Sequence, residues 1–206
     1  MSNVGLLYVG AVLFINGLML IGKVPGKSAA IINFFVGAMQ VVFPTIIIAQ
    51  SNGDPAVILG ASGLYLFGFT YLYVALNQTF GLPGEGLGWF SLFVAFCAVG
   101  YGILNFTQAN DPVFGVIWWI WAVLWFLFFL LLGLGKDSLT LFTGWFTIIV
   151  AHLTATIPAL LLLSGSFEAT TTNAIWMAAG GIVALAAAWF LGKRTAVSRA
   201  SATAPA

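Results

Sequence analysis

The chain has 206 residues, of which 62% are apolar and only 5% are charged. A soluble globular domain carries about 25% charged residues, so six basic and five acidic side chains cannot cover a water-soluble surface of this size. The net charge of +1 argues against a nucleic-acid partner, because no basic run could neutralise several phosphates. We therefore expect a protein that is solvated by membrane lipid.

Uncharged apolar runs alternate along the chain with short polar breaks, and seven of these runs are 19 to 23 residues long. A helix needs about 20 residues to cross roughly 30 Å of hydrocarbon. The breaks are rich in Pro, Gly, Asn and Asp, which turn the chain and end helices. The predicted fold is an all-α polytopic membrane protein with seven transmembrane helices. The predicted spans are Val4–Gly22, Ala29–Gln50, Ala56–Asn77, Leu87–Phe106, Val113–Gly135, Leu141–Leu163 and Ala174–Gly192.

The last predicted span is less hydrophobic than the others because it is rich in Ala and Gly. It carries no charge, and Trp176 and Trp189 lie near its ends, where tryptophan commonly anchors helices at the membrane interface. Residues 193–206 are rich in Ala, Ser and Thr and are predicted to form a disordered tail. The expected organisation is a six-helix bundle in residues 1–163, an additional transmembrane helix at 174–192, and this tail.

The basic residues predict which end of the bundle faces the cytoplasm. All six fall after spans one, five and seven, and therefore on one side of the membrane. The connections on the other side contain only acidic charged residues, which are Asp54, Asp111 and Glu168. The positive-inside rule then places the N-terminus outside and the C-terminus, with its tail, in the cytoplasm. The six basic residues are Lys23, Lys27, Lys136, Lys193, Arg194 and Arg199.

A short apolar pattern recurs at intervals of 58 and 56 residues, at Phe34–Gly37, Leu92–Ala95 and Ile148–Ala151. Each copy lies in an even-numbered span, after a cytoplasmic connection. Repeats are common in transport proteins, and here they would form two-helix hairpins around a shared path. Apolar helices also resemble one another by composition alone, so a weak two-helix repeat and chance similarity both stay open.

The spans lack the residues that catalysis needs. No acidic residue, Lys or Arg lies inside any span, and His152 is the only histidine. Carboxylate pairs, metal clusters and a serine triad therefore cannot form there. We predict no catalytic residue, no metal and no cofactor, and hence a protein that is not an enzyme. A retinal protein is excluded because the last span has no lysine for the Schiff base.

The spans do contain a few neutral polar side chains among dense aromatic residues, above all Trp118, Trp119, Trp121 and Trp125. A flat, uncharged amide suits such a path, since it can slide along aromatic faces and exchange hydrogen bonds with sparse polar groups. Ions cannot readily enter an apolar constriction, and the absence of buried charges also disfavours ion coupling. For any one aromatic residue taken alone, packing or anchoring is the alternative interpretation.

Five stretches of sequence are distinctive: Leu6–Gly10, Asn33–Gly37, Phe67–Tyr73, Ser91–Ala95 and Trp121–Trp125. They resemble the AmiS/UreI family of bacterial urea channels and amide transporters, and the similarity runs in order through the first six spans. The resemblance implies a six-helix channel in each protomer and assembly as a homo-hexamer. It further implies passive diffusion of urea, acetamide and similar short-chain amides across the bacterial cytoplasmic membrane. The seventh span makes the chain more similar to the amide-transporter branch.

The resemblance also implies which residues line the pore. Leucines correspond to its narrow points and aromatic residues to its walls, and Phe67 and Tyr71 are four apart, so they share one helix face. His152 has two open interpretations, a polar residue near the pore or a hydrogen-bonded histidine between helices. The predicted pore-lining residues are Leu6, Leu13, Asn16, Phe67, Tyr71, Trp118, Trp121, Leu124, Trp125 and His152.

The chain departs from the acid-gated urea channels of this family in two ways. Those channels have longer external loops that bear histidines, whereas the external connections here are short and lack histidine, so gating by acid is not expected. They also carry a glutamate in span six where Val150 stands here. The expected partners are a small neutral amide, membrane lipid, further copies of the chain, and a cytoplasmic amidase or urease. The alternative function is a non-conducting membrane scaffold that docks a cytoplasmic amidase.

Overall fold

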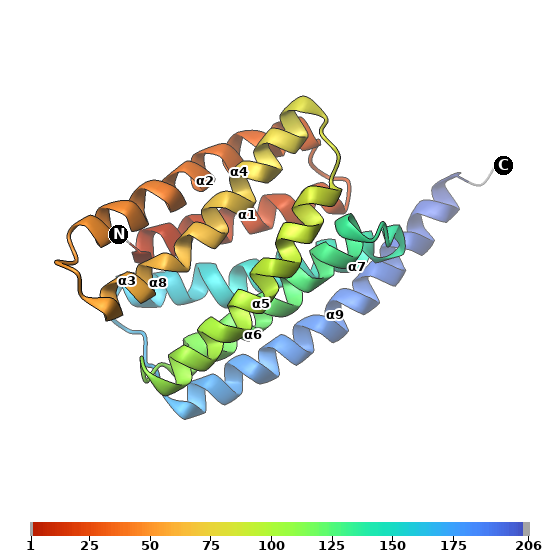
Figure 1. Cartoon of the computed structure of the whole chain (residues 1–206). Coiled ribbons are helices and arrows are strands. Elements are labelled where there is room, and N and C mark those ends of the chain that lie inside the picture. Colours follow the sequence, from red (N-terminus) through yellow and green to blue (C-terminus); the bar gives the residue numbers. More distant parts are fainter. Residues whose placement is uncertain (1, 204–206) are drawn as a thin grey trace.

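The computed structural model describes residues 2–203, and within that range the chain is a bundle of helices without a β-strand (Figure 1). Seven helical segments are long and apolar enough to cross a membrane, which confirms the predicted fold. The elements are α1 (Ser2–Leu20), α2 (Gly26–Ala49), α3 (Pro55–Ser62), α4 (Leu64–Phe80), α5 (Glu85–Thr107), α6 (Pro112–Phe128), the π-helix η1 (Phe129–Gly133), the 3-10 helix η2 (Asp137–Leu139), α7 (Thr140–Val150), the π-helix η3 (Ala151–Thr156), α8 (Ile157–Leu163) and α9 (Thr171–Thr203).

Helices of neighbouring spans form the closest pairs in the bundle. α2 packs along α4, α5 along α6, and α7 along α9, while α1 contacts both α2 and α7. Glycines allow the close approach of α2 and α4. A Cβ atom at Gly37 would lie 2.8 Å from the backbone nitrogen of Leu72, and one at Gly68 would lie 2.9 Å from the backbone oxygen of Gln40. Small residues of this kind let membrane helices pack backbone to backbone.

The third span is divided into α3 and α4 at Gly63, although the sequence predicts one continuous helix. A Cβ atom at Gly63 would lie 2.9 Å from two ring atoms of Trp118, so the glycine makes room for a ring from α6. Next to it, the hydroxyl groups of Ser62 and Tyr101 are hydrogen-bonded at 2.6 Å. The break therefore lies where α5 and α6 contact the third span.

The sixth span changes its helical type where α7 passes into η3 and then into α8. Pro158 follows this turn and has no backbone N–H group to donate to the preceding turn. A π-helical turn, with its wider hydrogen-bond spacing, accommodates such an interruption. The Thr154 hydroxyl, inside η3, donates to the backbone oxygen of Val150 at 2.6 Å and faces α6.

α9 is longer than predicted, and residues 193–203 are helical where the sequence predicts a disordered tail. It continues past Gly192 to Thr203, and in Figure 1 it projects beyond the rest of the bundle; residues 204–206 lie outside the described range. Alanine-rich sequence favours helix. The Lys193 ammonium lies 4.5 Å from the centre of the Trp189 ring, and the Arg199 side chain donates to the backbone oxygen of Ile21. The Arg199 contact joins this extended end of α9 to the residue that follows α1.

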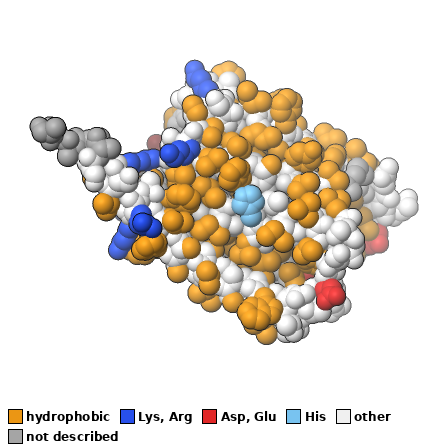
Figure 2. Space-filling model, turned by 180° about the vertical axis from the view of Figure 1, so that it is seen from behind, with side chains coloured by type: hydrophobic (Ala, Val, Ile, Leu, Met, Phe, Trp, Pro, Cys, Tyr) orange, Lys and Arg blue, Asp and Glu red, His pale blue; other side chains and the backbone are white. Residues whose placement is uncertain are grey.

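A broad apolar surface surrounds the bundle, as a protein in lipid requires. Phe34, Phe96 and Trp176 are among its exposed side chains. Figure 2 shows one face of this surface, with Lys and Arg side chains toward one end and the histidine in the middle of the apolar band. The chain is thus a multi-pass membrane protein, and its charged side chains lie toward the ends of the bundle, whereas His152 is exposed on the apolar surface between them.

Candidate permeation pathway

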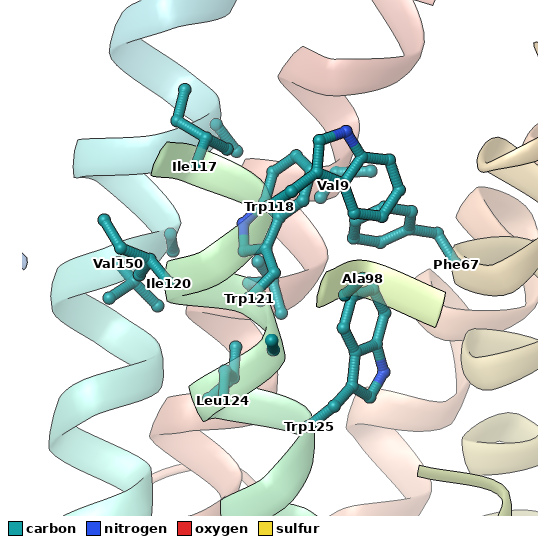
Figure 3. Packing of buried hydrophobic residues seen from close by; sticks show 14 of the residues in the cluster. Val9, Phe67, Ala98, Ile117, Trp118, Ile120, Trp121, Leu124, Trp125 and Val150 are labelled. Atoms are coloured by element: carbon teal, nitrogen blue, oxygen red, sulfur yellow. The ribbon is translucent and has the colours of Figure 1, made fainter. Parts of the chain in front are cut away.

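Four aromatic side chains from two helices meet in the centre of the bundle. Phe67 of α4 lies against three tryptophans of α6, with ring centres 5.8 Å from Trp118, 4.7 Å from Trp121 and 4.7 Å from Trp125 (Figure 3). The tryptophans share one face of α6 because they are three and four residues apart. The contact between Phe67 and Trp121 is edge to face, an arrangement that aromatic quadrupoles favour.

The Trp121 ring is held in place by a hydrogen bond that it donates to a second helical segment, η3. Its indole Nε1 donates to the Thr154 hydroxyl oxygen at 2.8 Å, and that hydroxyl in turn donates to the backbone of η3. Both side chains are buried. A buried indole N–H needs such a partner, since an unpaired polar group inside a membrane protein is costly. The orientation of Trp121 is therefore fixed by the π-helical turn of span six.

Two cavities lie on opposite sides of the Phe67–Trp121 contact. The larger one has a volume of about 390 Å³, and its lining includes Ser2 at the start of α1 and Asp111 next to the start of α6. The smaller one has a volume of about 20 Å³, enough for one group of the size of a water molecule. Phe67 and Trp121 line both cavities, so their two rings form the wall between them.

Eight of the ten predicted site residues line these cavities. Leu6 and Trp118 line the larger cavity, and Phe67 and Trp121 line both. The remaining four, Leu13, Tyr71, Leu124 and Trp125, line the smaller cavity. The structure thus brings together side chains from α1, α4 and α6 along one line through the bundle.

Two predicted site residues lie elsewhere. Asn16 is buried in a reciprocal amide pair with Asn33 of α2, at 2.9 and 2.6 Å, and borders neither cavity. Its hydrogen bonds join α1 to α2, which is a structural role. His152 is exposed on the outer apolar surface, and its ring centre lies 5.2 Å from that of Phe14 (Figure 2). The prediction that His152 lines the pore is therefore wrong for this protomer.

Gln40 lines the larger cavity and was not among the predicted site residues. Its side chain is completely buried, yet neither its Oε1 nor its Nε2 atom has a hydrogen-bond partner within the described structure. The sequence contains one signal for it, because Gln40 is the only glutamine well inside a predicted span. On the other side of the ring wall, the Tyr71 hydroxyl is likewise buried and without a partner among the described residues.

The cavity walls are almost free of charge. Among the described residues that line the two cavities, Asp111 is the only charged one, and its Oδ1 atom caps α6 by accepting from the backbone N–H of Phe114 at 2.9 Å. Across residues 2–203, no three His, Cys, Asp or Glu side chains gather closely enough to hold a metal ion. The arrangement suits a small neutral molecule that forms hydrogen bonds, and next to the ring wall it provides no charged side chain for an ion.

The chain is similar to known transporters and channels over most of its length. A model of the AmiS/UreI family transporters matches residues 1–166. A candidate transporter protein of Rhodococcus erythropolis, AmiS2, is 56% identical over 191 residues, which cover 93% of each chain. The acid-activated urea channel of Helicobacter pylori strain J99 is 40% identical over 190 residues, covering 79% of this chain and 97% of the channel.

The fold is shared with a solved structure as well. The closed-state structure of the Helicobacter pylori urea channel superimposes with a TM-score of 0.74 at 39% identity. It covers 82% of this chain and 100% of the channel. The family match ends at residue 166, before α9 begins, so the matched region corresponds to the first six spans.

Proposed function

The chain belongs to the AmiS/UreI family of transporters, and on this premise we propose that it is a passive channel for small neutral amides such as urea and acetamide. Family membership sets it among membrane transporters and channels rather than enzymes. The similar proteins carry two kinds of name, a transporter of the AmiS type and a urea channel. Urea and acetamide share a planar group in which a carbonyl oxygen accepts and an amide nitrogen donates hydrogen bonds.

The observation that carries the proposal is the pair of cavities on either side of the Phe67–Trp121 wall, whose only charged lining residue is Asp111 at one end of the larger cavity. A flat molecule can pass between two rings that a hydrated ion cannot separate, because the ion would lose its water without gaining a partner. The eight lining residues of the predicted set are the proposed pore, with Leu6, Leu13 and Leu124 as its narrow points.

Buried polar groups without partners support an amide as the permeant. An unpaired buried hydrogen-bonding group costs about 1–3 kcal/mol. Gln40 and the Tyr71 hydroxyl carry this cost on opposite sides of the ring wall. A permeant that donates and accepts hydrogen bonds would remove this free-energy cost by pairing with Gln40 in the larger cavity and then with the Tyr71 hydroxyl in the smaller one.

The setting of this channel is part of the proposal. We place it in the bacterial cytoplasmic membrane with the N-terminus outside, because the basic residues lie on one side of the spans. The larger cavity then opens to the outside, since Ser2 and Asn3 are among its lining residues. We further propose assembly as a homo-hexamer, flux that is not gated by acid, and metabolism of the entering amide by a cytoplasmic amidase or urease.

Stopped-flow light scattering on proteoliposomes tests the function. Acetamide and urea should enter proteoliposomes faster than empty liposomes of the same lipid, and glycerol should show a much smaller gain because it is neither planar nor an amide. Equal rates for proteoliposomes and empty liposomes would reject the channel. Binding of a cytoplasmic amidase to the membrane protein together with unchanged permeability would instead support the scaffold.

A further inference from the structure

The Gln40 carboxamide is the buried polar group in the larger cavity that has no partner. Other polar groups in the cavity wall are already engaged: the Tyr101 hydroxyl pairs with Ser62 at 2.6 Å, and the Asn105 amide donates to the backbone of Tyr101 at 2.8 Å. The indole N–H of Trp121 is bonded to Thr154. Gln40 is fully buried, so bulk solvent does not supply the missing hydrogen bonds.

Glycines hold a space for this carboxamide. A Cβ atom at Gly5 of α1 would lie only 2.6 Å from the Gln40 Oε1 atom, so any larger residue at position 5 would push the carboxamide aside. On the other side, Gly68 brings the α4 backbone against the backbone of Gln40 and sets the residue next to Phe67. α1, α2 and α4 therefore hold one amide group in the wall of the cavity that Phe67 and Trp121 close.

From this geometry we infer that Gln40 is the selectivity-determining residue of the pathway, and that it recognises the amide group of the permeant. A primary carboxamide has one acceptor and one donor edge in a single plane. A permeant with the same group, such as acetamide or urea, can form two parallel hydrogen bonds with it, N–H to oxygen in each direction. This inference rests on the proposed function, since it names the group that selects the proposed permeant.

The pairing would act just before the narrowest point. Phe67 and Trp121 line the same cavity as Gln40, so an amide paired with Gln40 would have its plane fixed in the cavity that the two rings close. Hydrogen bonds to Gln40 would then orient the permeant before it passes between the rings. Glycerol and water also form hydrogen bonds, but they cannot form this planar double pair.

The test replaces Gln40 by Met, which keeps the length of the side chain but removes the donor and the acceptor. In Gln40→Met proteoliposomes, acetamide and urea fluxes should fall at least about fivefold, the effect expected for two lost hydrogen bonds. Water flux, measured in the same preparation, should not change. The thermal midpoint of the detergent-solubilised variant should equal or exceed that of the wild type, because no unpaired polar group remains.

Two further variants make the result specific. Gln50→Met makes the same change at the exposed end of the same helix, and it should leave all three fluxes unchanged. Gly5→Ala should lower amide flux by displacing the Gln40 carboxamide, although Gln40 itself is intact. Ala favours helix more than Gly does, so the Gly5→Ala variant should fold. It therefore tests the role of Gln40 even if Gln40→Met fails to insert into the membrane.

Distinct results would overturn the inference. If Gln40→Met and Gly5→Ala conducted amides as well as the wild type, Gln40 would not take part in recognition. An equal fall of amide and water flux would mean that Gln40 only hydrates the cavity. A wild-type protein that conducts no amide at all would instead refute the proposed function, so the two failures are distinguishable.

Discussion

Trp121 shows how much of the pathway depends on single side chains. It contacts Phe67 and Trp118, lines both cavities, and is bonded through its indole nitrogen to Thr154. The spacing of the tryptophans predicts that they share a face of α6, and the family resemblance indicates that this face is the inner one. Neither reveals that a threonine of another span fixes the ring, because that contact arises only from tertiary packing.

His152 and Asn16 are the two predicted pore residues that border neither cavity, and the reasons differ. His152 lies in η3, two residues after Val150, which matches the glutamate position of the family; two residues turn a helix by about 200°, so the resemblance does not give His152 the same face. Asn16 does face inward, but its partner Asn33 lies 17 residues away on α2. The sequence alone can predict that Asn16 is buried inside the bundle. It does not show which residue forms the hydrogen bonds with it.

We expect Trp121→Ala to reduce selectivity for planar amides. Removing the ring opens the wall between the two cavities, so the ratio of acetamide to glycerol flux should fall about fivefold to tenfold, or about 1–1.4 kcal/mol. Flux through proteoliposomes measures this ratio. Trp189→Ala is the matched control, because that ring is 54% exposed on α9 and borders neither cavity. If Trp189→Ala changed the flux ratio and Trp121→Ala did not, the pathway would lie elsewhere.

At the scale of helices, hydropathy and turn residues suffice to locate the seven spans, and the predicted ends lie within a few residues of the observed ones for six of them. Three features depend on packing instead. The helix is interrupted at Gly63, where the Trp118 ring packs against the chain. The π-helical turn η3 lies directly before Pro158, which has no backbone N–H group to donate. α9 continues to Thr203 and contacts the end of α1 through Arg199, an interaction between residues far apart in the chain.

The α2–α4 contact gives a stability prediction for an element. Gly37→Ala should lower the thermal stability of the solubilised protein by about 1–3 kcal/mol, because the new methyl group would overlap backbone atoms of α4 that cannot move aside. Gly100→Ala is the control, since a Cβ atom at Gly100 meets nothing within 4 Å. It should be neutral or stabilising by up to about 1 kcal/mol. An equal response to both changes would contradict close backbone packing as the basis of this helix pair.

For the molecule as a whole, we expect amide flux to depend little on pH. Histidine is the side chain that ordinarily changes its charge between about pH 5 and 8, and the single histidine lies on the apolar outer surface. Flux should therefore stay within about twofold between about pH 5 and 7.5. Stopped-flow rates at matched osmotic gradients measure it. A steep rise in acid would identify an external carboxylate, Asp54 or Asp111, as a gate.

The contact between Phe67 and Trp121 also determines how the passage depends on temperature. The ring centres are only 4.7 Å apart, so in the proposed pathway a molecule in the larger cavity would pass only when one ring swings aside. In a close-packed interior such a swing is an activated jump, and its enthalpy adds to that of permeation. Trp121 is tethered by its hydrogen bond, whereas the Phe67 side chain has no polar group, so in the proposed pathway we expect Phe67 to be the ring that moves. Conduction would thus proceed in separate thermal steps, and on cooling it would slow more steeply than flow through an open, water-filled pore.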